Sequence, residues 1–127
     1  MAELVLDASA VLAHLRDEPG ADEILNLMDG GLLSAVNLTE IVQKLVDDGL
    51  SLDGIAASVD VLPVRIVAFD QRLAMQAAIL RGPTRRFGLS LGDRACIALA
   101  VRESLPVLTA DRVWADLDLG VEVVLIR

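Results

Sequence analysis

Short, wholly apolar segments rich in Val, Leu and Ile alternate along this chain with longer segments whose apolar residues recur at helical spacing. Strands that are apolar on both faces indicate a parallel sheet, because crossover helices cover both sides of such a sheet. The pattern predicts a three-layer α/β/α domain with a central, mostly parallel sheet of four to five strands. We expect strands at 4–6, 32–36, 61–69, 106–111 and 121–126, helices at 8–15, 21–28, 38–46, 52–59, 71–80 and 91–102, and a plain loop at 81–88.

The chain has the size and content of one domain. Its 127 residues contain no linker, internal repeat or low-complexity tract, so we expect a single domain spanning 1–127. Hydrophobic residues make up 54% of the sequence, but the aromatic ones are only two Phe and one Trp. This scarcity argues against a module that binds single-stranded nucleic acid by stacking bases on aromatic rings.

Several other classes of protein are excluded by cysteine content, hydropathy and charge. The single cysteine, Cys96, rules out an intrachain disulfide and argues against a Cys-based zinc site. No apolar run approaches the ~20 residues that a membrane span needs, and no signal-peptide pattern precedes the first strand, so we expect a soluble, cytoplasmic protein. The net charge of −8 argues against a general nucleic-acid coating protein but does not exclude an enzyme that holds cations.

Four acids are notable for their positions relative to the expected strands and helices. Asp7 follows the first expected strand and Asp111 follows the fourth. Glu40 and Asp93 lie in the first turns of the helices expected at 38–46 and 91–102. Because right-handed crossovers make parallel strands point the same way, these positions gather along one edge of the sheet, where open α/β sheets bind ligands.

Each of these acids also has an ordinary structural explanation. Ser90 and Asp93 have the spacing of a capping box, as do Asn37 and Glu40, and acids in a first turn complement the helix dipole. An acid directly after a strand can cap the helix or turn that follows it. Caps need no common edge, however, so four such acids on one edge favour a binding site.

The four acids lie in the segments VLDASA, NLTEIV, LGDRACIALA and VLTADRVW. In this order, these segments resemble the signature segments of PIN-domain ribonucleases, specifically the VapC-like toxins of bacterial toxin–antitoxin pairs. The resemblance covers nearly the whole chain in length, order of elements and acid positions. It implies a PIN-like fold, metal-dependent endoribonuclease activity, an antitoxin whose tail masks the acids in a groove, and a homodimer.

The resemblance also implies roles for individual residues. The four acids of the family match Asp7, Glu40, Asp93 and Asp111, which would be the catalytic and metal-binding residues. The hydroxyl groups that accompany them in the family match Ser9 and Thr109. Trp114 stands where the family usually has an aromatic residue, and Asp116 is a further supporting acid.

Clustered carboxylates suit the hydrolysis of a phosphodiester, since Mg²⁺ or Mn²⁺ held by oxygen ligands neutralises charge and activates water. Four acids exceed the charge of one divalent ion, so either a second ion arrives with the substrate or some of the acids orient water. The candidate contacts for RNA phosphate groups are arginines near the acids: Arg85, Arg86, Arg94 and Arg112.

Two alternative functions use the same expected sheet edge. An aspartate-nucleophile phosphatase would use Asp7 but would want a second Asp two residues later, where Ser9 stands, and a dedicated lysine, whereas Lys44 lies within a different helix. A receiver-like regulatory binding module, which is not an enzyme, would want a paired acid near the first strand and a lysine after a later one. The segment VLTADRVW offers no such lysine.

Other chemistry-bearing residues have simple structural explanations. We expect His14 at a helix surface or interface, Cys96 in the core and Trp114 in packing. Four apolar residues of the first two helices exceed what a small core requires, and we expect them to form a dimer or antitoxin face: Leu12, Leu15, Leu27 and Met28.

Overall fold

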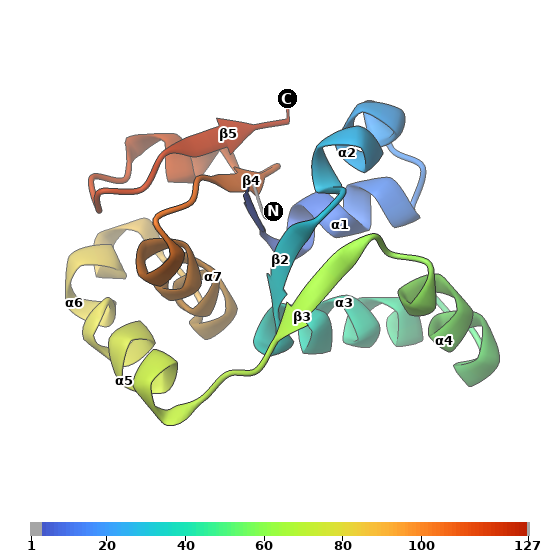
Figure 1. Ribbon diagram of the computed structural model, residues 1–127, viewed down its shortest axis with the longest axis horizontal. Coiled ribbons are helices and arrows are strands. Elements are labelled where there is room, and N and C mark those ends of the chain that lie inside the picture. Colours follow the sequence, from blue (N-terminus) through green and yellow to red (C-terminus); the bar gives the residue numbers. More distant parts are fainter. Residues whose placement is uncertain (1–3, 127) are drawn as a thin grey trace.

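The structure, a computed structural model, describes residues 4–126 and has a five-stranded parallel sheet at its centre (Figure 1). The strand order across the sheet is β3-β2-β1-β4-β5. The strands are β1 (Val5–Leu6), β2 (Gly31–Ser34), β3 (Val64–Val67), β4 (Val107–Thr109) and β5 (Val123–Leu125). The predicted three-layer α/β/α architecture is confirmed, while the predicted domain limits, 1 and 127, lie outside the described residues.

Helices connect the strands and cover both faces of the sheet (Figure 1). The α-helices are α1 (Ala8–Leu15), α2 (Ala21–Met28), α3 (Ala35–Asp47), α4 (Leu52–Asp60), α5 (Gln71–Ile79), α6 (Arg81–Thr84) and α7 (Leu91–Glu103). Two 3₁₀ helices, η1 (Arg85–Phe87) and η2 (Arg112–Asp116), complete the described elements. None of the helices within residues 4–126 is both long and apolar enough to span a bilayer.

Alternate residues of the buried strands pack into two separate cores. Leu6, Leu33 and Leu108 face the core formed with α1–α4, and their strand neighbours Val5 and Val107 face the core formed with α5 and α7. Each fully buried side chain of this kind contributes roughly 1.5–3 kcal/mol of hydrophobic stabilisation. The side-chain period of two explains why the strands are apolar on both faces.

The sheet reverses its direction of growth at β1. One neighbour of β1 is β2, with Val5 in register with Leu32, and the other is β4, with Leu6 in register with Leu108. Connections that leave a sheet in opposite directions open a crevice at the carboxyl ends of the strands. Asp7 follows β1 directly and Thr109 ends β4, so both lie at this crevice.

Local structure corrects three sequence-based boundaries. Segment 81–88 is not a plain loop, because α6 and η1 follow α5 closely and the Thr84 hydroxyl donates to the Leu80 carbonyl at 2.7 Å. The expected strand at 61–69 shortens to β3, since Val61 caps α4 and the Leu62 amide donates back to the Val59 carbonyl at 3.1 Å. Helix α3 begins three residues earlier than expected because Ser34 caps it by accepting from the Val36 amide.

Most residues that were expected to have structural roles lie in the environments predicted for them. Cys96 and Trp114 are fully buried, and half-buried His14 places Nδ1 at 3.4 Å from the Ala21 carbonyl oxygen. The predicted partner face is wrong for Leu12 and Met28, whose side chains belong to the core between the sheet and α1–α4. Of the other two residues, Leu27 is exposed and Leu15 is partly buried.

Candidate active site

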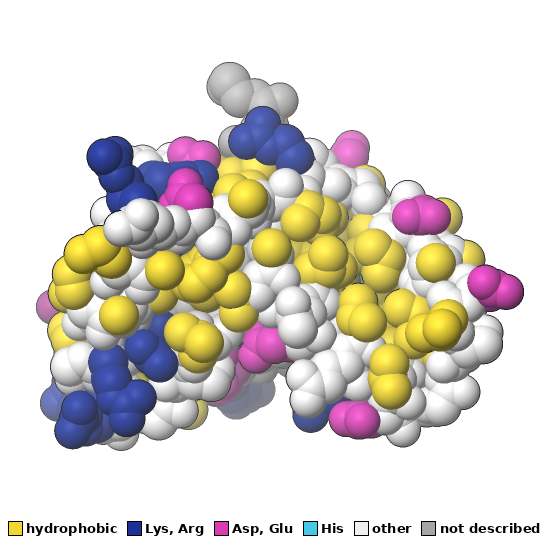
Figure 2. All heavy atoms as spheres, turned by 90° about the horizontal axis from the view of Figure 1, so that it is seen from below, with side chains coloured by type: hydrophobic (Ala, Val, Ile, Leu, Met, Phe, Trp, Pro, Cys, Tyr) yellow, Lys and Arg dark blue, Asp and Glu magenta, His cyan; other side chains and the backbone are white. Residues whose placement is uncertain are grey.

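All four predicted acids line one hollow at the carboxyl edge of the sheet. The hollow has a volume of about 210 Å³ and is lined by Asp7, Ala8, Ser9, Leu12, Glu40, Lys44, Asp93 and Asp111. Figure 2 views the molecule from below, where acidic side chains gather at a notch between its two halves. Residues separated by as many as 104 positions in the sequence (7 to 111) therefore meet at the switch point of the sheet.

Asp7 is the most enclosed of the four acids. Only 3% of its surface is exposed, and its Oδ1 accepts from the Ala8 amide at 2.8 Å. Its Oδ2 accepts from the Ser9 hydroxyl at 2.7 Å and from the Thr109 hydroxyl at 2.9 Å. The carboxylate of Asp7 thus caps α1 and is fixed in orientation from both sides.

The two hydroxyl groups also tie the loop after β4 to the loop after β1. The Ala110 amide donates to Ser9 Oγ at 3.0 Å, and the Asp111 amide donates to Thr109 Oγ1 at 3.0 Å. Each hydroxyl therefore accepts from the backbone of one segment while it donates to Asp7. This network places Asp111 at the same hollow as Asp7.

Glu40 reaches the hollow from the second turn of α3. Its Oε1 accepts from Asn37 Nδ2 at 2.8 Å, and the same nitrogen donates to the Gly92 carbonyl oxygen at 3.0 Å. The predicted capping box of Asn37 and Glu40 is wrong, because Ser34 is the cap and Asn37 lies inside the helix. Asn37 instead links Glu40 to the start of α7.

Asp93 and Asp111 both stabilise the turns that carry them. The predicted capping box of Ser90 and Asp93 is confirmed, with Asp93 Oδ2 accepting from the Ser90 amide at 3.0 Å. Asp111 Oδ1 accepts from the Val113 amide at 3.0 Å and so caps η2. Asp93 and Asp111 can therefore each cap a helix and also line the hollow, since each cap uses only one carboxylate oxygen.

Burial and mutual repulsion perturb the protonation of the acids. Burial is the main cause that raises the pKa of Asp7, and the charge of Asp93 adds to it against the hydroxyl hydrogen bonds. The pKa of Glu40 is raised by burial and by the charges of Asp7 and Asp93. The pKa of Asp93 is raised by burial and by the charge of Asp111. The cluster would be stabilised by a positive ion at neutral pH.

The sequence matches the family model of the PIN domain over residues 4–119. The chain belongs to the PIN-domain family. The resemblance indicated by the four acid-bearing segments is thereby confirmed. No curated protein matches the sequence significantly.

Solved toxin–antitoxin proteins share the fold of this PIN domain. The toxin–antitoxin complex from Klebsiella pneumoniae aligns with a TM-score of 0.75 at 16% identity and covers 98% of each chain. VapC20 of Mycobacterium tuberculosis, a sarcin-ricin loop cleaving toxin, aligns with a TM-score of 0.72 at 15% identity over 94% of this chain and 99% of that one. The M. tuberculosis VapBC-5 structure is 28% identical, with a TM-score of 0.64 over 100% of this chain and 99% of its own.

The donor set of this PIN domain fits a hard divalent cation. The hollow offers carboxylate and hydroxyl oxygens and no sulfur or imidazole ligand among its lining residues. Across residues 4–126, no three His, Cys, Asp or Glu side chains lie close enough together to hold a metal ion directly, so an ion in the hollow would be held partly through its waters. Such an arrangement suits an ion that keeps several of its waters.

The remaining predicted site residues lie outside this hollow. Arg85, Arg86 and Arg112 are exposed, and Asp116 is exposed at the end of η2. The expectation of RNA contact at Arg94 requires correction, because its guanidinium is buried and donates to the Ala77 carbonyl at 3.1 Å. Arg94 therefore joins α7 to α5.

Three residues of the site were missed by the sequence-based analysis. Lys44 lines the hollow because it follows Glu40 by one helical turn and shares its face of α3. Its spacing from Glu40 was a usable signal. The roles of Asn37 and Gly92 depend on how α3 meets α7, which local patterns do not specify.

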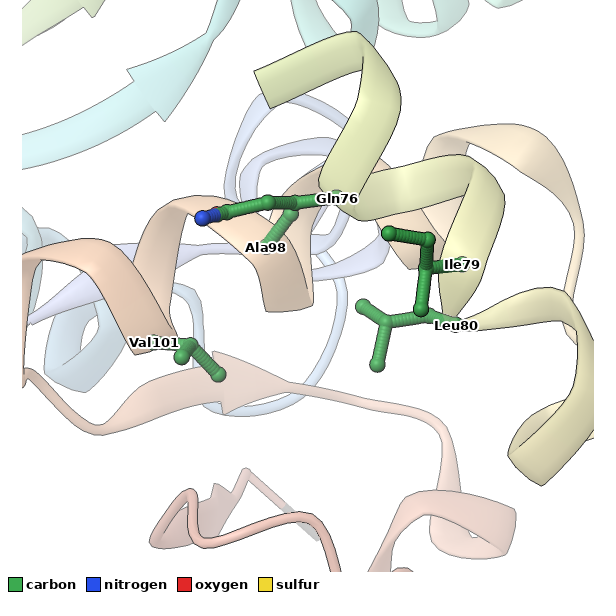
Figure 3. A pocket seen from close by; sticks show the side chains of 5 residues that line it. All are labelled: Gln76, Ile79, Leu80, Ala98 and Val101. Atoms are coloured by element: carbon green, nitrogen blue, oxygen red, sulfur yellow. The ribbon is translucent and has the colours of Figure 1, made fainter. Parts of the chain in front are cut away.

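A second, apolar groove lies between α5 and α7, lined by Gln76, Ile79, Leu80, Ala98 and Val101 (Figure 3). Its volume is about 190 Å³. None of its lining residues lines the acidic hollow. Ile79, which lines the groove, and Met75, one turn earlier on α5, are both exposed.

Proposed function

We propose that this PIN domain is a Mg²⁺- or Mn²⁺-dependent endoribonuclease that hydrolyses RNA phosphodiester bonds as the toxin of a toxin–antitoxin pair. The observation that carries the proposal is the meeting of Asp7, Glu40, Asp93 and Asp111 in one hollow at the switch point of a PIN-domain sheet. The similarity to VapC20, a sarcin-ricin loop cleaving toxin, supports this assignment.

In this proposal, the four carboxylates hold the cation. When bound, Mg²⁺ or Mn²⁺ neutralises negative charge on the phosphodiester and lowers the pKa of the water that acts as the nucleophile. Asp93 and Asp111 each use one oxygen for a cap, so the other oxygen can accept from the attacking water and orient it. The water oxygen bonds to phosphorus, the P–O bond to the leaving ribose oxygen breaks, and one water proton ends on that oxygen.

The RNA backbone follows an arginine-rich side of the molecule in this proposal. Residues 71–92 contain four Arg and no acid, although the chain as a whole has a net charge of −8. Figure 2 shows basic side chains gathered on the side that carries α5 and α6. We propose that Arg85, Arg86 and Arg112 contact phosphate groups, because Arg presents a fork of donors to phosphate oxygens.

The proposed partners are a cognate antitoxin and a second copy of this chain. Several of the structures that share this fold are toxin–antitoxin complexes. Exposed apolar side chains give surface for partners on α2–α4 and on α5 and α7: Leu25, Leu27, Val46, Leu52, Val61, Met75, Ile79 and Val101. The RNA substrate implies action in the cytoplasm. Light scattering on the chain with and without antitoxin tests the dimer.

The surroundings of Asp7 disfavour the aspartate-nucleophile phosphatase. Both carboxylate oxygens of Asp7 accept hydrogen bonds, and the side chain is buried. Ser9, which stands where such a phosphatase would want its second Asp, donates one of these hydrogen bonds instead. Lys44 does line the hollow, so its position does not speak against a phosphatase.

The proposal is tested by the cleavage of a structured RNA by the purified chain with Mg²⁺, Mn²⁺ or EDTA. We expect cleavage only with a metal, and a loss of at least about 100-fold in rate for Asp7→Asn and Asp93→Asn. Asp60→Asn, an exposed acid at the end of α4, is the matched control and should retain full activity.

Cleavage in EDTA, or full activity of both variants, would remove the ribonuclease proposal. Incorporation of phosphate at Asp7 from a small phosphodonor would favour the phosphatase or the receiver-like module. These outcomes separate the ribonuclease from the two alternative functions without knowledge of the natural RNA.

A further inference from the structure

We propose that Asn37 and Gly92 act together as positioning residues that hold the Glu40 carboxylate at the acidic hollow. The inference rests on the proposed function, in which Glu40 helps to bind the cation. It adds two residues that touch neither the cation nor the RNA. Both act on Glu40 from within the contact between α3 and α7.

Asn37 joins two helices of the site, α3 and α7, through a single amide. Its side chain is fully buried, and Nδ2 donates to Glu40 Oε1 at 2.8 Å and to the Gly92 carbonyl oxygen at 3.0 Å. Both N–H groups are therefore used, one on α3 and one on the first turn of α7. The amide fixes the direction of the Glu40 carboxylate relative to α7.

The orientation of this amide is determined by its neighbours. A flip of the Asn37 side chain would place Oδ1 against two oxygen acceptors, which is unfavourable. In the observed orientation, Oδ1 is buried and has no hydrogen-bond partner among the described residues. A buried amide with an unused acceptor is a poor choice for packing alone, which indicates that the two N–H donors are the reason for Asn at this position.

Gly92 provides the space that the Glu40 carboxylate occupies. A Cβ atom at position 92 would overlap the carboxyl group of Glu40. Gly92 has no left-handed backbone conformation, and Ala is the better helix former, so backbone geometry does not require glycine there. The missing side chain is therefore best explained by the close approach of Glu40.

Repulsion between the acids makes such restraint necessary. The charges of Asp7 and Asp93 act against a charged Glu40. Lys44 offsets these charges in part, but Glu has three side-chain torsions and so has other rotamers that lie farther from Asp7 and Asp93. Asn37 attracts one oxygen and Gly92 leaves room beside α7, so that Glu40 stays in the hollow.

The first test is a thermal unfolding cycle in EDTA, which needs no activity. Gly92→Ala should lower the Tm of the wild-type chain relative to its effect in a Glu40→Ala background, because its Cβ displaces the Glu40 carboxylate and leaves the buried Nδ2 of Asn37 without that acceptor. In a Glu40→Ala background, the same change should have little effect. Gly82→Ala, where an added Cβ meets nothing within 4 Å, is the matched glycine control and should not depend on Glu40. An equal cost of Gly92→Ala in both backgrounds would overturn the proposal.

The second test separates positioning from general stability. Calorimetric titration with MnCl₂ should show about tenfold or greater weakening of binding in Asn37→Leu and in Gly92→Ala, as expected when a group that orients a metal ligand is lost. The rate of RNA cleavage should fall mainly in kcat. Asn26→Ala, on the exposed face of α2, is the asparagine control. Wild-type Mn²⁺ affinity in both site variants would overturn the proposal.

A further readout uses the side-chain amide of Asn37 directly. The chain has only two asparagines, Asn26 and Asn37, so their ¹⁵N side-chain signals are separable. The Asn37 pair should exchange slowly with solvent and shift strongly in Glu40→Ala; an exposed, unshifted pair would contradict the geometry. If the wild-type chain neither binds Mn²⁺ nor cleaves RNA, the proposed function fails. The Asn37 signal and the thermal cycle still test whether Asn37 and Gly92 hold the Glu40 carboxylate in place.

Discussion

The hydroxyl group of Thr109 donates a 2.9 Å hydrogen bond to Oδ2 of Asp7, a residue 102 positions away in the sequence. Through this bond, the end of β4 fixes the acid that follows β1. The Ser9 hydroxyl donates to the same oxygen at 2.7 Å. The most buried carboxylate of the hollow is thus held by two hydroxyl groups from opposite sides of the switch point.

Thr109→Val should weaken this arrangement without changing the shape of the side chain. Hydrogen bonds to charged groups contribute about 1.5–3 kcal/mol, so we expect a stability loss of that order at neutral pH. The affinity for Mn²⁺ should fall roughly 10–100-fold, because Asp7 loses one of its orienting donors. Thermal unfolding and calorimetry measure the two effects.

Thr39→Val is the control for this change. The Thr39 hydroxyl is exposed and donates to the Ala35 carbonyl at 3.1 Å within α3. Its loss should leave Mn²⁺ affinity unchanged. Equal effects of the two threonine variants on Mn²⁺ binding would contradict the role of Thr109.

Glu40→Gln should stabilise the metal-free protein at neutral pH. Burial and the charges of Asp7 and Asp93 raise the pKa of Glu40 above its ordinary value of 4.5. A raised carboxyl pKa means that its favourable contribution to folding is fully present below the unfolded pKa, and is lost as pH rises through the folded pKa. The charged glutamate therefore costs stability at pH 7 unless a cation is bound.

Unfolding by urea in EDTA at pH 4 and pH 7 measures this prediction. The stability gain of Glu40→Gln should be larger at pH 7 than at pH 4, and Mg²⁺ should reduce it by stabilising the wild type more than the variant. Asp60→Asn should show no such pattern. A gain that is independent of both pH and Mg²⁺ would be inconsistent with a strained carboxylate.

Lys44→Met should weaken RNA binding and reduce its dependence on salt. Among the described residues, Lys44 is the only basic one that lines the hollow, one turn beyond Glu40 on α3. If it contacts one phosphate, the slope of log affinity against log salt should fall by about 0.7. The measurement is binding of a labelled RNA in EDTA over a salt series. Gln43→Met, the exposed neighbour on α3, should keep the wild-type slope.

The double variant Arg85→Gln, Arg86→Gln tests the proposed RNA path away from the acids. Both residues are exposed, and Arg86 lies over the Phe87 ring with 4.7 Å between its Cζ and the ring centroid. Loss of two phosphate contacts should lower the salt slope by about 1.4 and raise KM more than it lowers kcat. Arg65→Gln, on edge strand β3, should have no effect. An unchanged salt slope in the double variant would show that the RNA does not contact Arg85 and Arg86.

Much of the fold and the meeting of the acids could be predicted because both depend on local patterns. The apolar strand segments and the helical spacing of apolar residues predicted the parallel sheet. The positions of Asp7 and Asp111 at its edge followed from the strands that precede them. The capping box of Ser90 and Asp93 is a local feature and was also correct. These predictions needed only the direction of the strands and right-handed crossovers.

The errors arose where a tertiary contact decides the outcome. Ser34 both ends β2 and caps α3, so the helix begins three residues earlier than expected. Asn37 is therefore not a cap but a buried residue inside α3 that bonds to Gly92. Arg94 looked like a surface cation beside Asp93, but the packing of α7 on α5 buries it. The space that Gly92 leaves for Glu40 is visible only when both helices are present.

Anomalous diffraction from crystals soaked in Mn²⁺ tests the central claim most directly, because it locates the ion independently of activity. The account predicts a strong peak in the hollow lined by Asp7, Glu40, Asp93 and Asp111, and its loss in Asp7→Asn crystals. A Mn²⁺ site elsewhere on the molecule, or a peak in the hollow that survives removal of these carboxylates, would contradict it.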